Sequence, residues 1–194
     1  MRLYSINAVA AATAAAAAIA GCGGISGGYG SNPAPPAAFA WLKAGAAPAG
    51  WEVAQTRSGA TLAYPSGWHP IRTDPGTASA APRGRSGYFA GYLNATPQGG
   101  DETVGNWRRF RVAHVAAEGA HGVRLAAAVT GVRFRSGRAS CVIDSYSTTR
   151  MRFREIACIV AGPRATTVVV AAAPARRWAH EAPLLRRAVA SFRT

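Results

Sequence analysis

Lysine and acidic residues are scarce in this chain of 194 residues. Lysine occurs once, at Lys43, and 8 aspartate and glutamate residues stand against 22 basic ones, so arginine supplies nearly all of the formal net charge of +14. Such an excess fits nucleic acid, anionic lipid or an acidic wall polymer as a partner, or only a GC-rich coding bias with no partner role. The sequence has no zinc-ligand spacing and no aromatic RNP-like strand, so we expect no nucleic-acid binding.

Cysteine and histidine are also few. The chain has 3 cysteines and 4 histidines, and the histidines are scattered along it. A metal site needs more ligands than two cysteines without a nearby histidine, and a hydrolase of the nucleophile-elbow type needs a Gly-x-Ser-x-Gly motif that this sequence lacks. We therefore expect no metal, no cofactor and no catalytic residue of this kind.

The amino-terminal region is an uncharged, alanine-rich run. It extends from Leu3 to Gly21 behind a single arginine, Arg2. Alanine is too weakly apolar for this run to anchor a protein permanently, so residues 1–21 are expected to be a removable signal peptide. The sequence Ile19-Ala20-Gly21-Cys22 resembles the bacterial lipobox, which implies that Cys22 carries lipid.

One alternative for the signal stays open. The residues Ala18-Ile19-Ala20 also satisfy the small-x-small rule of ordinary secretion, which would leave Cys22 as a free thiol. Under the lipobox interpretation, acyl chains on Cys22 hold the protein in the bilayer, on the extracytoplasmic face of the cell membrane. Partners must then approach it there.

Three regions are expected after the signal. Residues 22–50 are rich in glycine, alanine and proline and predict a flexible tether. Within it, the apolar cluster at residues 39–42 is expected to dock as a strap on the domain. Residues 51–194 are expected to form one globular domain.

Hydrophobic periodicity predicts strands, a helix, more strands and a last helix. Alternation predicts a hairpin at 51–56 and 60–64, a strand pair at 139–148 and 151–160, and a buried central strand at 165–173. Helical spacing places Trp107, Phe110, His114 and Ala117 on one face of a helix within 102–119, with His114 as a hydrogen-bonded core residue. The last helix buries a stripe made of Trp178, Ala182, Leu185, Val189 and Phe192.

Short connections between the strands favour an α+β domain with a single, largely antiparallel sheet covered by helices. Two motifs point to a family with this architecture. The segment from Gly59 to Trp68 reads Gly-Ala-Thr-Leu-Ala-Tyr-Pro-Ser-Gly-Trp, and the last helix ends near Ser191-Phe192. Both features resemble PsbP-like domains, many of which are bacterial lipoproteins. The resemblance implies a binding or assembly protein without catalytic residues and names no specific partner.

Cys141 and Cys158 remain once Cys22 is assigned to lipid. They can pair only with each other, and an extracytoplasmic compartment allows the disulfide. Sixteen residues separate them and both flanks are strand-like, so the bridge is predicted to join adjacent antiparallel strands.

This register sets Asp144 opposite Glu155, an unfavourable pair of like charges. The interaction could be offset by an arginine of the neighbouring strand, Arg133 or Arg135, by a metal or by a shared proton. The register could also differ. A functional acidic pair is the weakest of these interpretations.

Arginines are also expected on the outer faces of the two helices. They are Arg108, Arg109 and Arg111 on the first helix and the pairs Arg176-Arg177 and Arg186-Arg187 at the second. They either form solvated faces or dock on anionic lipid or wall polymer.

The sequence thus favours a membrane-anchored envelope lipoprotein that acts as a non-enzymatic binding or assembly module. Two alternatives are an envelope enzyme that uses Asp144 and Glu155, and a carrier of apolar cell-wall lipid, which needs a roomy cavity.

Overall fold

A computed structural model describes residues 36–82, 91–135 and 137–194. The predicted signal peptide and Cys22 lie outside these residues. The described chain begins with a short 3-10 helix, η1 (Ala37–Phe39). The side chains of Phe39 and Leu42 are buried in the main hydrophobic core, so the segment at 39–42 packs on the domain.

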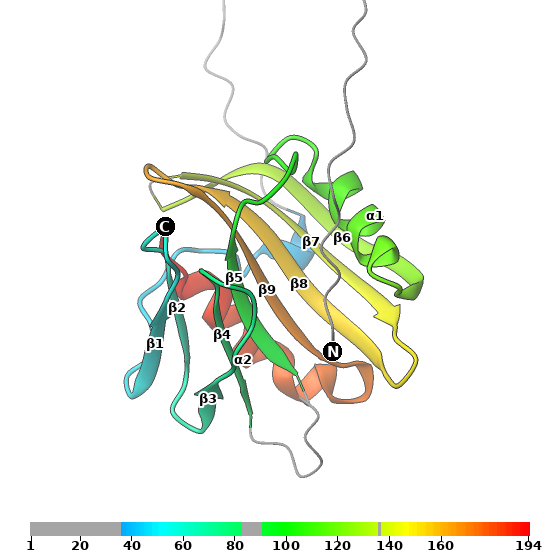
Figure 1. Cartoon of the computed structure of the whole chain (residues 1–194), viewed down its shortest axis with the longest axis horizontal. Coiled ribbons are helices and arrows are strands. Elements are labelled where there is room, and N and C mark those ends of the chain that lie inside the picture. The colour runs from blue at the N-terminus through cyan, green and yellow to red at the C-terminus, as the bar shows by residue number, and fades with distance from the viewer. Residues whose placement is uncertain (1–35, 83–90, 136) are drawn as a thin grey trace, which may run out of the picture. The chain divides into compact units, whose positions relative to one another are not determined.

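Seven antiparallel strands form the main sheet (Figure 1). The strand at its centre is β9, whose run Val168-Val169-Val170 suits a buried strand. Five of the strand connections join spatial neighbours, as expected for an antiparallel sheet. In spatial order the strands are β3 (Trp68–Pro70), β4 (Ala78–Pro82), β5 (Tyr92–Pro97), β9 (Thr166–Pro174), β8 (Arg152–Ala161), β7 (Gly137–Ser147) and β6 (His121–Phe134).

A separate hairpin is formed by β1 (Trp51–Gln55) and β2 (Thr61–Pro65). Its turn falls at the predicted Arg57-Ser58-Gly59, where Gly59 takes a φ of 89° that favours glycine. The hairpin is tied to the end of the chain by an isolated bridge between Thr61 and Arg193.

Two α-helices lie on opposite faces of the sheet (Figure 1). Helix α2 (Trp178–Ser191) follows the short 3-10 helix η2 (Ala175–Arg177), and all five residues of its predicted apolar stripe are buried. Helix α1 (Trp107–Ala117) covers the other face. The domain is α+β with a largely antiparallel sheet, which confirms the predicted fold class. No helix among the described residues is long and apolar enough to cross a bilayer.

Helix α1 differs from its prediction in where it begins and in which face it buries. It begins at Trp107 because Thr103 and Asn106 exchange hydrogen bonds before it: the Asn106 Oδ1 accepts from the Thr103 N–H at 2.7 Å and the Thr103 Oγ1 accepts from the Asn106 N–H at 3.1 Å. Its buried residues are Trp107, Arg111 and Val115, four residues apart. The prediction for His114 was wrong, because this residue is exposed and its Nε2 lies 3.3 Å from Glu118 Oε1.

Strand β6 forms one edge of the sheet and pairs with β7 in an interrupted register. The register shifts between His121 and Arg124, between Leu125 and Ala127, and between Val129 and Val132. Gly131 lies in the last of these irregularities with a φ of 68°. Strand β6 is therefore one long strand interrupted by bulges.

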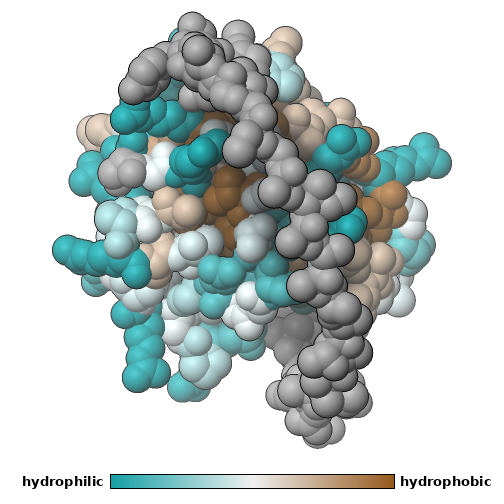
Figure 2. Space-filling model, turned by 90° about the horizontal axis from the view of Figure 1, so that it is seen from above, coloured by the Kyte–Doolittle hydropathy of each residue, from teal (hydrophilic) through white to brown (hydrophobic). Residues whose placement is uncertain are grey.

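Acidic and basic side chains are distributed unequally between interior and surface. Three acids, Glu102, Asp144 and Glu155, are buried. Figure 2 shows hydrophilic residues projecting at the left, the lower left and the upper right of the face that it draws. Among the described residues, four acids are exposed, namely Glu52, Asp74, Asp101 and Glu118, against fourteen arginines: Arg57, Arg72, Arg108, Arg109, Arg124, Arg133, Arg138, Arg150, Arg152, Arg164, Arg176, Arg177, Arg187 and Arg193.

Candidate functional site

Asp144 and Glu155 are neighbours on adjacent strands. Their Cα atoms are paired in the register of β7 and β8, as expected from the pairing of Cys141 with Cys158. Side chains alternate along a strand, so these two acids face α1 whereas the adjacent Ile143 belongs to the core on the α2 side. The row of paired residues across five strands is Leu125, Asp144, Glu155, Ala172 and Tyr92.

Arg111 of α1 forms an ion pair with Glu155. Its Nε donates a hydrogen bond of 2.7 Å to Glu155 Oε1, and its Nη2 lies 2.7 Å from the same oxygen. Glu155 is fully buried and Arg111 is 7% exposed. Burial alone lowers the pKa of Arg111, but Glu155 and the nearby tyrosines outweigh this effect and raise the pKa above its ordinary value. The guanidinium is therefore a permanent cation beside the acids.

An arginine does offset the acidic pair, but it is not one of those predicted. Arg133 is exposed and pairs in register with Arg138. Arg135 extends toward the end of α2, where its Nε donates to the Phe192 carbonyl oxygen at 2.9 Å. The prediction that Arg111 lies on the outer face of its helix was also wrong. The signal for its burial was the four-residue spacing of Trp107, Arg111 and Val115.

Three carboxylate oxygens in this cluster have no hydrogen-bond partner among the described residues: both of Asp144 and Oε2 of Glu155. Asp144 is fully buried. Burial, and next the charge of Glu155, raise the pKa of Asp144 to about 7, although Arg111 opposes this shift. The Asp144 carboxyl therefore retains a proton at pH values where a solvent-exposed aspartate is ionised.

Two tyrosines complete the cluster. The hydroxyl groups of Tyr92 on β5 and Tyr146 on β7 lie 3.3 Å apart. Burial is the main cause that raises the pKa of Tyr92 to about 12 and also raises the pKa of Tyr146. Both phenols are therefore neutral hydrogen-bonding groups at physiological pH. Tyr146 lies two residues from Asp144, which is the sequence signal that both share one face.

We call Tyr92, Arg111, Asp144, Tyr146 and Glu155 the α1-side polar cluster. Trp107 lies beside it, and its indole Nε1 donates to the Ala157 carbonyl oxygen at 2.9 Å. Both acids are wholly inaccessible to solvent, so the cluster can join α1 to the sheet and hold a proton. Within the described ranges, no three His, Cys, Asp or Glu side chains are grouped so that they could bind a metal ion.

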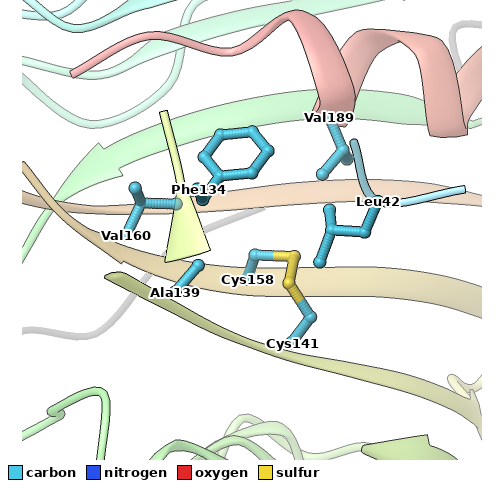
Figure 3. Close-up of a pocket in the computed structure, with 7 residues that line it drawn as sticks. All are labelled: Leu42, Phe134, Ala139, Cys141, Cys158, Val160 and Val189. Carbon is cyan, nitrogen blue, oxygen red and sulfur yellow. A yellow bond between two sulfur atoms is a disulfide. The ribbon is translucent and has the colours of Figure 1, made fainter. Parts of the chain in front are cut away.

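The predicted disulfide is confirmed. Cys141 and Cys158 are bonded, with Cα atoms 4.1 Å apart, and face the α2 side of the sheet. Side chains pack closely around the bridge (Figure 3). The gap that they leave has no room for a water molecule, and it is lined by Leu42, Phe134, Ala139, Cys141, Cys158, Val160 and Val189.

A second hollow lies at the surface, between the β1–β2 hairpin and the end of the chain. Its volume is about 260 Å³, and it is lined by Ala47, Val53, Thr61, Ala63, Ser191 and Arg193. Pockets that bury a small ligand are typically about 300–1,000 Å³. Neither of these two hollows therefore matches the roomy interior that a carrier of long acyl chains needs.

The remaining predicted arginines are mostly on the outer faces of the helices. Arg108 and Arg109 on α1, the pair Arg176 and Arg177 in η2, and Arg187 on α2 are exposed, whereas Arg186 is partly buried against Trp41.

Solved structures with the same fold exist. The solution structure of cyanobacterial PsbP (CyanoP) from Synechocystis sp. PCC 6803 matches with a TM-score of 0.55 at 14% identity, covering 76% of this chain and 94% of that one. This match shows that the fold is PsbP-like. No protein-family model and no curated protein matches the chain.

Two further structures match more weakly. A Pseudomonas aeruginosa protein of unknown function matches with a TM-score of 0.44 at 8% identity, covering 74% of this chain and 96% of that one. LpqN, involved in cell envelope biogenesis of Mycobacterium tuberculosis, matches with a TM-score of 0.41 at 15% identity, covering 69% of this chain and 82% of that one.

Proposed function

We propose that this protein is an envelope lipoprotein, held in the membrane by acyl chains on Cys22, whose domain acts as a non-enzymatic binding module. The observation that carries the proposal is the division of charge between interior and surface. Three acids are buried inside the fold and do not contribute to the surface charge, while fourteen arginines are exposed. A surface of nearly one sign attracts anionic partners by summed charge, without a specific pocket.

The burial of Asp144 and Glu155 supports a binding module rather than an enzyme. A catalytic carboxyl group must come within hydrogen-bond distance of the substrate. Both acids are covered by α1 and the tyrosine pair, and Arg111 already occupies one oxygen of Glu155. A structural role accounts for the two acids without a substrate.

The anchor is tested by the substitution Cys22→Ser. The full-length variant should leave the membrane fraction. The native protein should resist an alkaline wash, because two or three acyl chains together hold a protein in the membrane almost permanently. Ser26→Ala is the matched control and should stay in the membrane. A Cys22→Ser chain that resists the wash would contradict the anchor.

The choice between binding module and enzyme is tested by Asp144→Asn in the intact lipoprotein. Partners crosslinked in the native envelope should be captured equally by the native chain and by this variant, provided that circular dichroism shows the variant to be folded. If a folded variant no longer captures these partners, or no longer supports the function of the native protein in cells, the function depends on the acidic pair.

A further inference from the structure

The N-terminal segment joins the described domain beside α2. The first described residues lead into η1, and the Gly45 N–H donates to the Ala190 carbonyl oxygen of α2 at 3.0 Å. The guanidinium carbon of Arg186, also on α2, lies 5.8 Å from the ring centroid of Trp41. The strap therefore runs along the carboxyl-terminal half of α2.

This position limits where a lipid-anchored domain can be. A chain from Cys22 to Pro36 spans at most about 50 Å when fully extended. The bilayer that holds an acylated Cys22 consequently lies within that distance of η1. Of the two helical faces of the sheet, the α2 face is the one that adjoins this attachment point.

Basic residues cover the same face. In η2 and α2 there are four arginines and one acid, Glu181, which forms an ion pair with Arg177. Exposed Lys43 directly follows the strap. On β8, alternation directs Arg152 to the same face as Arg154, whose guanidinium carbon lies 5.3 Å from the ring centroid of Trp178. We call these residues the α2-side basic surface: Lys43, Arg152, Arg154, Arg176, Arg186 and Arg187.

Tryptophan occurs beneath two of these arginines. Trp41 is half-buried under Arg186, and Trp178 is largely buried under Arg154. Stacking of a guanidinium group on an indole restricts its motion while its outer edge stays able to bind an anion. Partly exposed tryptophan is also typical of the headgroup region of bilayers.

The α1 face carries a more balanced charge. Exposed arginines on this side are Arg108 and Arg109 on α1, together with Arg138 of β7 and its partner Arg133, which alternation places on the α1 face. They are partly balanced by Glu118, which ends the helix, and by Asp101 in the loop before it, both exposed. Such mixed charges attract an anionic surface much less than a group of cations does. The two helical faces therefore differ in how far basic residues outnumber acids, and in their distance from the strap.

We propose that the α2-side basic surface docks on the headgroups of anionic phospholipids in the same bilayer that holds Cys22. The inference rests on the proposed lipid anchor. Headgroup phosphates bind the arginines of this surface. The anchor keeps the domain close to the bilayer, so the local concentration of headgroups around the surface is high. The domain then lies with α2 toward the membrane and α1 toward the envelope space.

The test uses the native lipoprotein reconstituted in liposomes of phosphatidylcholine with or without phosphatidylglycerol. Arginines are modified with phenylglyoxal, and the rate at each position is read by mass spectrometry. Phosphatidylglycerol should slow modification of Arg176 and Arg187 about fivefold, the factor that corresponds to the ~1 kcal/mol gained by a basic residue near an anionic surface. High salt should abolish the difference, and Arg108 and Arg109 should react equally in both liposomes.

Two matched double variants sharpen the test. Arg176→Gln with Arg187→Gln should remove the protection of Arg186, whereas Arg108→Gln with Arg109→Gln should leave it intact. Equal reactivity of the α2 arginines in both liposomes would overturn the docking surface. So would protection on the α1 side, or protection of the α2 arginines by a soluble anionic wall polymer in liposomes that lack phosphatidylglycerol. A chain that fails to incorporate because Cys22 is not acylated contradicts the proposed anchor itself.

Discussion

Helix α2 is held to the sheet by apolar side chains, whereas helix α1 is held by polar groups as well. On the α2 side, the core includes Leu185, Val189 and Phe192 together with the Cys141–Cys158 bridge. On the α1 side of the described chain, the buried apolar cluster consists of Trp107, Val142, Ala157, Ile159 and Val170, and the Arg111–Glu155 ion pair lies beside it. The packing of α2 and the packing of α1 on the sheet are therefore sensitive to different changes.

Apolar contacts tolerate changes of pH and salt, but a buried ion pair depends on every one of its charges. The desolvation of Arg111 and Glu155 cancels much of their attraction, so the pair adds little net stability compared with apolar residues. Removal of one partner, however, leaves a buried charge without compensation. The α1 side is therefore the more sensitive of the two faces.

The largest expected effect follows from Arg111→Met. This change leaves the Glu155 carboxylate buried without its cation, and we expect a loss of about 3–5 kcal/mol in the free energy of unfolding. Urea denaturation followed by circular dichroism measures it. Arg109→Met on the same helix is the control and should change stability by no more than about 0.5 kcal/mol, because Arg109 is exposed. Equal effects of the two changes would contradict the role of the ion pair.

On the α2 side, loss of the disulfide should be somewhat milder. Replacing both Cys141 and Cys158 with alanine frees a loop with a sequence separation of 17, which is worth about 3 kcal/mol in the chain-entropy model. The melting temperature should fall by about 6–12 °C. Reduction of the native protein is the control and should cause a similar fall. A melting temperature that reduction does not change would rule out a stabilising bridge.

The third prediction concerns pH and distinguishes the two faces directly. Because the pKa of Asp144 is raised to about 7 in the folded protein, the folded state holds a proton that the unfolded state releases near pH 4. This group therefore stabilises the fold fully below about pH 4, and its contribution is lost as the pH rises to about 7.

Asp144→Asn should remove this pH dependence. We expect the native protein to lose roughly 2–4 kcal/mol relative to the variant between pH 4 and pH 8. Unfolding in urea at several pH values measures the difference. Asp101→Asn, at an exposed position, should follow the native curve. Parallel curves for the native chain and Asp144→Asn would exclude a bound proton at Asp144.

The smallest effect is expected at the tyrosine pair. Tyr146→Phe removes the 3.3 Å contact between hydroxyl groups and leaves Tyr92 without it, at a cost of about 1 kcal/mol. A double-mutant cycle with Tyr92→Phe measures the coupling between the two phenols. Strictly additive losses would show that the hydroxyl groups do not interact.

The elements of the α2 side could be predicted from sequence because apolar periodicity determines them. The stripe from Trp178 to Phe192 and the Cys141–Cys158 pairing both follow from spacing, and the pairing also placed Asp144 opposite Glu155. Each of these features depends on a short sequence repeat: two residues along a strand, and three to four residues along a helix.

The partner of the acidic pair could not be found in the same way. Arg111 is 44 residues from Glu155, and only the packing of α1 on the sheet brings them together. A charged residue on a helix usually faces solvent. Sequence patterns therefore placed Arg111 on the outer face, and they predicted a buried face shifted by about one residue from the observed one. Buried ion pairs are exceptions to the pattern on which such predictions depend.

The edges of the sheet have a consequence for copies of the domain that the proposed lipid anchor would crowd together. An edge strand with a regular row of free N–H and C=O groups can add a strand from another molecule, which begins aggregation. Strand β6 has three register irregularities and carries the exposed residues Arg124 and Arg133, while the opposite edge, β3, has three residues and ends at Pro70. Bulges, charge and proline thus discourage strand addition at both edges, so crowded copies of this domain can meet side by side without fusing their sheets.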